Sequence, residues 1–215
     1  MDAPDKIIVV TRKTPLEELI ERFNSRAQAK FYIEHAGASF QPYEDEHEAY
    51  YRSVDVLKKS LPREPASQWI ERSFLPTFQF GERDLVVTVG QDGLVVNVAK
   101  YLATQPILAL NPDPQRIDGV LIPFLVPQAR RLLPRILEGR MKLKRISMAA
   151  AELNDGQTAL AVNDLFIGPK SHISAKYVLQ FGENGEPQRA TAGQRPGAAT
   201  PGQPEDPDHG PGQYL

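Results

Sequence analysis

Short, continuous apolar runs bounded by charged or turn-forming residues recur along the first half of the chain. They lie at residues 6–11, 85–89 and 106–110. A run without a polar face is typical of a strand covered on both sides in a parallel sheet. With 215 residues, 41% of them hydrophobic, the chain is long enough to bury such a sheet. The sequence therefore predicts an α/β fold.

Helical signals separate these runs. Thr14, Pro15 and Glu17 supply an N-cap, a proline at the first helical position and a capping box, and apolar residues continue at helical spacing to Ala27. Apolar periodicity and its breakers predict further helices at residues 44–60, 94–102 and 128–137. Strand 85–89, helix 94–102 and strand 106–110 would form one βαβ unit.

The pattern changes near residue 140. Strand-like stretches follow at residues 141–149, 158–167 and 175–181, separated by turn-forming residues at 154–156 and 182–185. Residues 190–215 are rich in proline and glycine and are predicted to be disordered. We expect a Rossmann-like α/β nucleotide-binding domain at 1–139, a partial β-rich domain at 140–189, and a tail at 190–215.

Charge and composition exclude several classes of function. A formal net charge of −2 argues against the broad basic surface of a nucleic-acid-binding protein. Cysteine is absent and the four histidines are scattered, so we expect no metal site built by the protein. No apolar run reaches the ~20 residues that span a bilayer, and the N-terminus lacks a signal-peptide pattern. We expect a cytoplasmic protein without membrane partners.

The segment Gly90-Gln91-Asp92-Gly93, which follows the run at 85–89, allows two interpretations. An Asp-Gly pair between two β-branched runs is a good β-hairpin signal. Alternatively, the glycines form a tight strand-to-helix turn whose backbone N–H groups point toward phosphates. Turn chemistry alone favours neither.

This segment resembles the Gly-Gly-Asp-Gly motif of the superfamily that joins NAD kinases, diacylglycerol kinases and phosphofructokinases. Asp84 before the strand, the Pro-Ile-Leu-Ala-Leu-Asn-Pro stretch at 106–112, and the Asn-Asp pair at 163–164 narrow the resemblance to NAD kinases. It covers roughly residues 6 to 189. The likeness is greatest to the branch that contains mitochondrial-type NAD kinases and bacterial proteins labelled sugar kinases.

The resemblance implies a phosphotransferase that moves the γ-phosphate of ATP, bound with Mg²⁺, to the 2′-hydroxyl of the NAD adenosine ribose. Asp92 matches the proton acceptor. Gly90 matches a glycine of the phosphate-facing turn, and Gly93 and Asn97 match contacts to the dinucleotide. Family members are commonly oligomeric, so the resemblance also implies a homo-oligomer.

Asn163 and Asp164 match the family's Asn-Glu pair, which binds NAD through an amide and a carboxylate. Without the resemblance, they are an ordinary polar bend between strands. Departures from the family pattern are Gln91 in place of glycine and Leu94 in place of threonine. A related lipid or sugar kinase is an alternative, because the Asp-Gly turn serves phosphoryl transfer in the whole superfamily. The departures keep open a nucleotide-binding pseudokinase as a second alternative.

Two further groups of cations could meet a triphosphate: Arg12 with Lys13 after the first strand, and Arg116 after Asn111-Pro112. Exposed surface cations are the commoner explanation. Beyond residue 189 the resemblance ends where the family continues with further strands. A shift of reading frame near residue 189 would account for the change in composition and predicts an incomplete, poorly active β domain.

Overall fold

A computed structural model describes residues 3–162, 165–166, 177–179 and 188–190. The chain divides into two compact units, residues 1–165 and residues 166–215, which are described separately. The predicted domain boundaries at residues 139 and 189 remain predictions.

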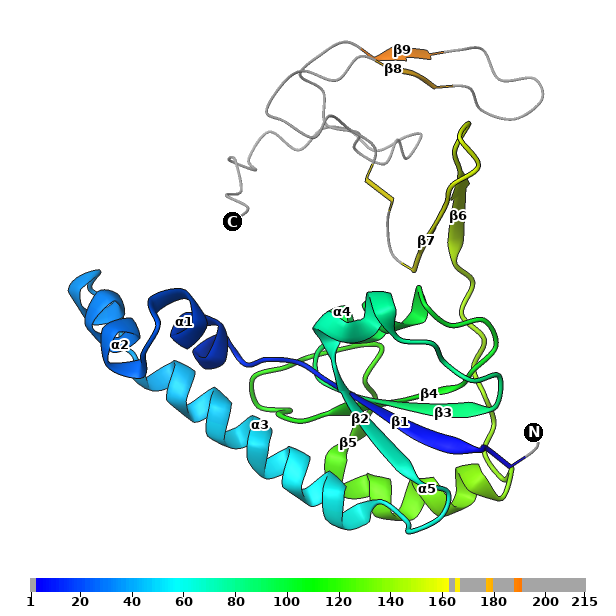
Figure 1. The fold of residues 1–215 in the computed structure, drawn as a ribbon, viewed down its shortest axis with the longest axis horizontal. Helices are drawn as coiled ribbons and strands as arrows, with labels where there is room; N and C mark the ends of the chain where they lie inside the picture. The colour runs from blue at the N-terminus through cyan, green and yellow to red at the C-terminus, as the bar shows by residue number, and fades with distance from the viewer. Residues whose placement is uncertain (1–2, 163–164, 167–176, 180–187, 191–215) are drawn as a thin grey trace, which may run out of the picture. The chain divides into compact units, whose positions relative to one another are not determined.

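A five-stranded sheet forms the centre of the first unit (Figure 1). Its strands are β1 (Lys6–Thr11), β2 (Ser67–Glu71), β3 (Asp84–Val89), β4 (Ile107–Asn111) and β5 (Phe124–Leu125). They lie in the order β2-β1-β3-β4-β5, and every neighbouring pair is parallel. The predicted α/β fold with a Rossmann-like parallel sheet is confirmed.

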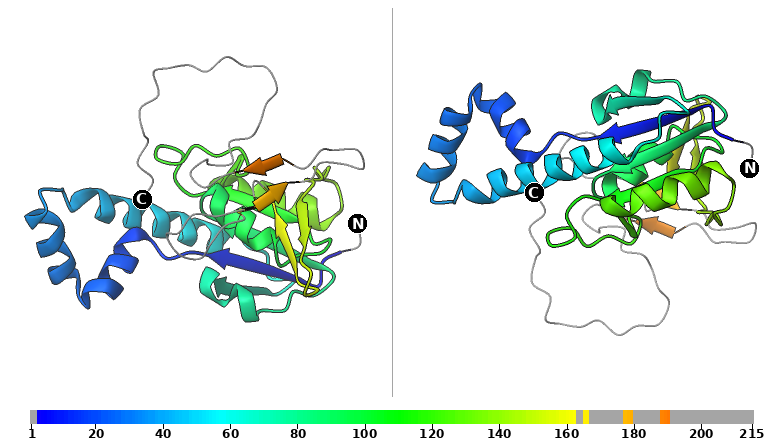
Figure 2. Two further views of the ribbon diagram at one scale, coloured as in Figure 1. Left: turned by 90° about the horizontal axis from the view of Figure 1, so that it is seen from above. Right: turned by 90° about the horizontal axis from the view of Figure 1, so that it is seen from below.

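Helices cover both faces of this sheet, as the views in Figures 1 and 2 show. One face carries α3 (Gln41–Ser60) and α5 (Ala129–Leu137), with the short turn η2 (Val126–Gln128) leading into α5. The other carries α4 (Asp92–Ala99) and the 3₁₀ helix η1 (Arg72–Thr77). Along β1, Ile7 and Val9 pack toward α3 and α5, while Ile8 and Val10 pack toward α4 and η1. This double burial explains why the strand lacks a polar face.

Two short helices replace the single first helix that the sequence predicted. α1 (Pro15–Phe23) begins with the predicted capping box at Thr14, but it ends four residues before Ala27. Asn24 adopts a left-handed conformation with φ 62°, and the Ser25 side chain accepts the N–H of Gln28, which caps α2 (Arg26–His35). The continuous apolar spacing is therefore broken by a local C-cap and a new N-cap.

A hairpin follows α5. β6 (Ala149–Glu152) pairs antiparallel with β7 (Thr158–Ala161), and Gly156 in the connecting turn has φ +83°. The turn predicted at residues 154–156 is thus confirmed. The predicted strand at 141–149 is wrong except for Ala149, because residues 141–148 form no strand and most of them are exposed.

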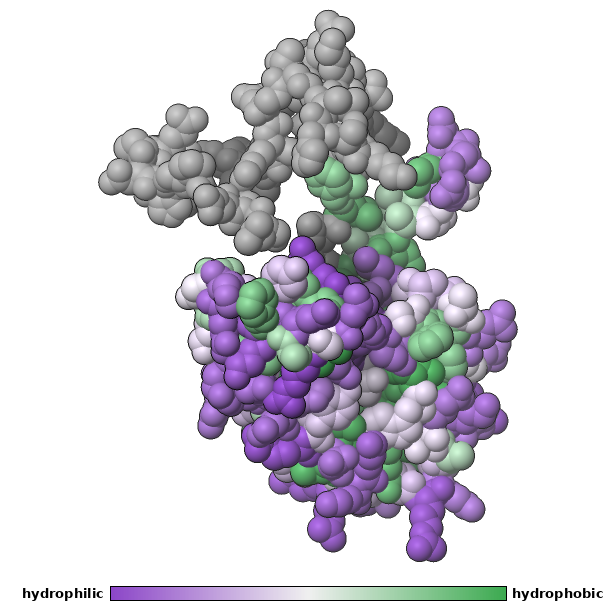
Figure 3. Space-filling view, turned by 60° about the vertical axis from the view of Figure 1, so that its left-hand side comes forward, coloured by the Kyte–Doolittle hydropathy of each residue, from purple (hydrophilic) through white to green (hydrophobic). Residues whose placement is uncertain are grey.

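In the second unit, β8 (Tyr177–Leu179) pairs antiparallel with β9 (Gln188–Ala190). The turn predicted at 182–185 and nearly all of the predicted tail lie outside the described residues. Within the described part of the chain, no helix is long and apolar enough to cross a membrane, and no group of three or more acidic, histidine or cysteine side chains could hold a metal ion. Hydrophilic side chains predominate on the face of the first unit drawn in Figure 3.

Candidate functional site

The order of the strands reverses between β1 and β3. From β1 the chain passes outward to β2 on one side, and then returns to place β3 and β4 on the other. Ligands of open α/β sheets bind outside the carboxyl ends of the strands at such a reversal. In this protein, Arg12 and Lys13 follow β1 at that point, and residues 90–93 follow β3. The fold therefore brings the sequence motif to the position where a ligand is expected.

The motif forms a strand-to-helix turn, and the hairpin interpretation is wrong. β3 ends at Val89, α4 begins at Asp92, and β3 pairs in parallel with β1 and β4. Gly90 is buried, and a Cβ atom there would lie 2.9 Å from Cδ2 of Leu94. Gln91 has φ −86°, so the turn requires no left-handed residue at the position where glycine is replaced. Gly93 faces open space, because no atom lies within 4 Å of the position that a Cβ atom would take there.

The carboxylate of Asp92 is held by the backbone of the β4–β5 connection. Its Oδ2 accepts the N–H of Val120 and its Oδ1 accepts the N–H of Leu121, both at 3.0 Å. Gly119 lies so close that a Cβ atom there would be 2.6 Å from Asp92 Oδ1. A carboxylate offers about four lone-pair sites, so two remain for another donor. Asp92 is thus fixed in orientation and still able to accept a hydrogen bond.

Polar contacts stabilise the connection that carries these amides. Asn111 donates from Nδ2 to the carbonyl of Ile117 at 2.8 Å and accepts the N–H of Asp113 at 2.9 Å. Asp113 in turn accepts from Arg116 at 2.6 Å. Ser53 of α3 donates to the carbonyl of Pro112 at 2.6 Å. The loop is therefore anchored at its start before it reaches Asp92.

Tyr50 of α3 joins the carboxyl ends of β1 and β3. Its hydroxyl donates to the carbonyl of Val89 at 3.1 Å and accepts the backbone N–H of Arg12 at 3.0 Å. The side chain is buried, and this burial raises the pKa of Tyr50 to about 12, although the hydrogen bond from Arg12 acts in the opposite direction. Tyr50 consequently remains a neutral hydrogen-bonding group at any physiological pH.

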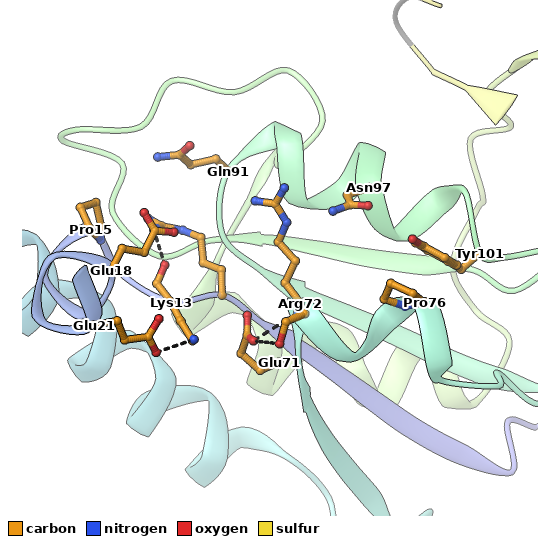
Figure 4. A pocket seen from close by; sticks show the side chains of 12 residues that line it. Lys13, Pro15, Glu18, Glu21, Glu71, Arg72, Pro76, Gln91, Asn97 and Tyr101 are labelled. Atoms are coloured by element: carbon orange, nitrogen blue, oxygen red, sulfur yellow. Dashed lines mark hydrogen bonds and ion pairs between the residues drawn. The ribbon is translucent and has the colours of Figure 1, made fainter. Parts of the chain in front are cut away.

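A cavity of about 700 Å³ opens beside the turn, between the β1–α1 connection, the end of β2, η1 and α4 (Figure 4). Sites for small molecules commonly have volumes of about 300–1,000 Å³. Its cationic side chains are Arg12, Lys13 and Arg72, and its acidic ones are Glu18, Glu21 and Glu71. Gln91, Asn97, Pro76 and Tyr101 form much of the remaining wall. The cavity thus combines charged groups near the turn with Pro76 of η1 and Tyr101, which follows α4.

The structure separates two of the predicted site residues. Asn97 lines the cavity, whereas Asp92 faces the β4–β5 connection and is not among the lining residues. At about 100° per residue, five positions place these side chains about 140° apart around α4. Asn163 and Asp164 lie outside the described residues, so their placement relative to Asp92 remains a prediction.

The cations predicted as possible triphosphate contacts are all paired with carboxylates. Nη2 of Arg12 lies 2.7 Å from Glu46, and Lys13 pairs with Glu21. Arg116 lies 2.6 Å from Asp113 and 3.9 Å from Asp45. A triphosphate that bound at these positions would therefore compete with the carboxylates for each cation.

Arg72 was missed by the sequence reasoning. It directly follows β2, a strand that was itself not predicted. The only signal in the sequence was the position of Arg72. It follows an apolar and a charged residue, Ile70 and Glu71, much as Arg12 and Lys13 follow the apolar run at 6–11.

Comparisons with known proteins assign no family to the chain. No family model matches it, and no curated protein matches it. Among solved structures, the chain is similar to one described as "Crystal Structure of Yeast NADH Kinase complexed with NADH", with 14% sequence identity and a TM-score of 0.34. The match covers 74% of this chain and 46% of that one, so the chain spans less than half the length of the yeast protein. A likeness at this level assigns neither a site nor an activity.

Proposed function

We propose that this chain is an NAD kinase-like phosphotransferase that moves the γ-phosphate of ATP to the 2′-hydroxyl of the NAD adenosine ribose. The observation that carries the proposal is the turn at residues 90–93. It joins a buried strand to a helix at the reversal of strand order and places a carboxylate at the start of that helix. This arrangement is what the motif Gly-Gln-Asp-Gly requires if it serves phosphoryl transfer.

In this proposal Asp92 accepts the proton of the ribose hydroxyl as that oxygen attacks the γ-phosphorus, while the bond from the γ-phosphorus to the β–γ bridging oxygen breaks and ADP leaves. The amides of Val120 and Leu121 hold the carboxylate in one orientation, and its remaining lone pairs receive the proton. Mg²⁺ bound to the triphosphate would supply charge neutralisation, and no described residue is assigned to it. The protein mainly positions the two substrates, which can supply about 7–11 kcal/mol of the barrier reduction in favourable cases.

We place the donor nucleotide in the cavity beside the turn. Its volume of about 700 Å³ lies in the range of small-molecule sites, and its charged end borders Gln91, immediately before Asp92. Gly90 and Gly93 are assigned to the phosphate-facing turn and to the dinucleotide respectively. Asn97, which the resemblance assigns to the dinucleotide, lines this cavity in the structure, so we propose that it contacts the donor nucleotide.

The proposal is tested by incubating the full chain with MgATP and NAD and measuring NADP by enzymatic cycling. Asp92→Asn should abolish turnover while NAD binding by calorimetry is preserved. The substitution also places an amide NH₂ against a backbone N–H, which removes one of the two loop contacts. Unfolding must therefore be compared with that of Gly119→Ala, which disturbs the same contact without changing the carboxylate. Substantial NADP formation by Asp92→Asn would refute the assigned role.

A second candidate is a nucleotide-binding pseudokinase. The observation in its favour is the engagement of both Asp92 oxygens by the β4–β5 connection, because a carboxylate that only anchors a loop would show the same contacts. NAD binding by the wild-type chain without any NADP formation would select this function.

A further inference from the structure

The three cations of the cavity differ in their surroundings. Arg12 is held by Glu46 and by the carbonyl of Lys13, and Lys13 pairs with Glu21. Arg72, by contrast, has no carboxylate within 4.0 Å among the residues that the structure describes. An anionic ligand that contacts Arg72 therefore has no protein carboxylate to displace.

The local fold directs Arg72 into the cavity. It is the first residue of η1 and directly follows β2, at the same edge of the sheet as Arg12. The adjacent carboxylate of Glu71 accepts the backbone N–H of Ser73 and caps η1, and it forms no ion pair with Arg72. In Figure 4 the guanidinium of Arg72 extends toward α4, in the gap between Gln91 and Asn97.

The remainder of the cavity wall suits a flat, weakly polar group. Pro76 of η1 and Tyr101 after α4 lie at the end of the cavity away from Lys13, and Tyr101 is 41% exposed. An aromatic ring and a proline ring present surfaces on which a planar base can stack. Asn97, one helical turn before Tyr101, supplies an amide between this end and Arg72.

We propose that Arg72 binds the phosphates of the donor nucleoside triphosphate, while the base lies against Pro76 and Tyr101 and the sugar passes Asn97. This orientation directs the phosphate end toward Gln91 and the start of α4. Arg72 would then determine the affinity for the triphosphate, whereas Arg12 and Lys13 maintain the shape of the cavity. The inference rests on the proposed phosphotransferase function for the identity of the ligand.

Binding of MgATP and of magnesium tripolyphosphate to the full chain is measured by calorimetry for four variants. Arg72→Ala should weaken the binding of both ligands by about tenfold or more, because hydrogen bonds from a guanidinium to phosphate oxygens are charge-assisted and stronger than neutral ones. Arg72→Lys should lose less affinity, since lysine keeps the positive charge but not the planar guanidinium with its paired donors. Tyr101→Ala should weaken MgATP alone. Arg52→Ala is the matched control, because Arg52 is an exposed arginine of α3 that does not line the cavity.

Equal affinities for Arg72→Ala and Arg52→Ala, or no binding of either ligand by the wild-type chain, would overturn the inference. The experiment distinguishes a failure of this inference from a failure of the proposed function. Loss of MgATP affinity in Arg72→Ala without NADP formation by the wild-type chain leaves the inference standing and removes the kinase. NADP formation with unchanged MgATP affinity in Arg72→Ala does the reverse.

Discussion

The hydroxyl of Tyr50 lies 3.1 Å from the carbonyl oxygen of Val89, and this hydrogen bond ties α3 to the last residue of β3. The same hydroxyl accepts the N–H of Arg12, the first residue after β1. One side chain thereby contacts the ends of both strands between which the order of the sheet reverses.

Tyr50→Phe should lower the free energy of unfolding by about 1–3 kcal/mol, because it leaves the buried carbonyl of Val89 and the partly buried N–H of Arg12 without their partner. Urea denaturation measures the change. The control is Tyr51→Phe on the next residue, whose hydroxyl donates to Glu17 at an exposed position where water can replace it. Equal losses in both variants would contradict a special role for the buried hydroxyl.

Substitution of the two motif glycines should have opposite effects on stability. Gly90→Ala places a methyl group 2.9 Å from buried Leu94 and should destabilise the protein by about 1–3 kcal/mol through overpacking. Gly93→Ala meets no atom within 4 Å and lies in the first turn of α4, so it should stabilise by about 0.5–1 kcal/mol. Thermal and urea unfolding compare the two directly. If Gly93 contacts the dinucleotide as proposed, the more stable variant should bind NAD more weakly.

Gly119→Ala should disturb the carboxylate of Asp92, although the two residues lie far apart in the sequence. The new methyl group would lie 2.6 Å from Asp92 Oδ1 and 2.5 Å from Ile122 Cγ1, so these side chains or the β4–β5 connection must shift. We expect lower stability, faster hydrogen exchange at the amides of Val120 and Leu121, and reduced NADP formation. Val120→Ala is the control, since its side chain is 86% exposed and its amide is retained. Unchanged exchange rates in Gly119→Ala would show that the contact tolerates the methyl group.

Glu17 should make stability depend on pH. Partial burial alone would raise the pKa of its carboxyl, but hydrogen bonds from Thr14 and Tyr51 outweigh it and lower that pKa below its usual 4.5. A depressed folded-state pKa contributes stability above pH 4.5, and this contribution is lost as the pH falls through the folded value. Denaturation measured between pH 3 and about 7 should therefore show that the free energy of unfolding falls less on acidification in Glu17→Gln than in the wild-type chain. Tyr51→Phe removes one of the hydrogen bonds to Glu17, so its loss of stability on acidification should lie between those of Glu17→Gln and the wild-type chain.

The sequence predicted the parts of the fold whose signals are local. The continuous apolar runs identified β1, β3 and β4, and the capping box at Thr14 marked the start of α1. The strand-to-helix turn at residues 90–93 was one of two open interpretations. It was decided by tertiary pairing, because β3 has parallel neighbours on both sides and no room for a hairpin partner.

The parts that were missed depend on contacts across the chain. β2 has exposed residues at its start, and only Ile70 among its five residues is buried. It therefore lacks the continuous apolar run that would have predicted a strand. The contact between Asp92 and the β4–β5 connection joins a side chain to backbone amides 28 and 29 residues later. Backbone donors carry no sequence signature, so this half of the site could be found only from the structure.

The backbone amides that hydrogen-bond to Asp92 belong to the β4–β5 connection. The orientation of this carboxylate therefore depends on the length of that loop as well as on the presence of aspartate at position 92. Inserting or deleting one residue between Asn111 and Gly119 would change which amides face α4, while every residue of the motif stayed intact. Homologues compared by motif alone could thus look equally competent and yet differ in activity, with the cause encoded in the spacing of a neighbouring loop.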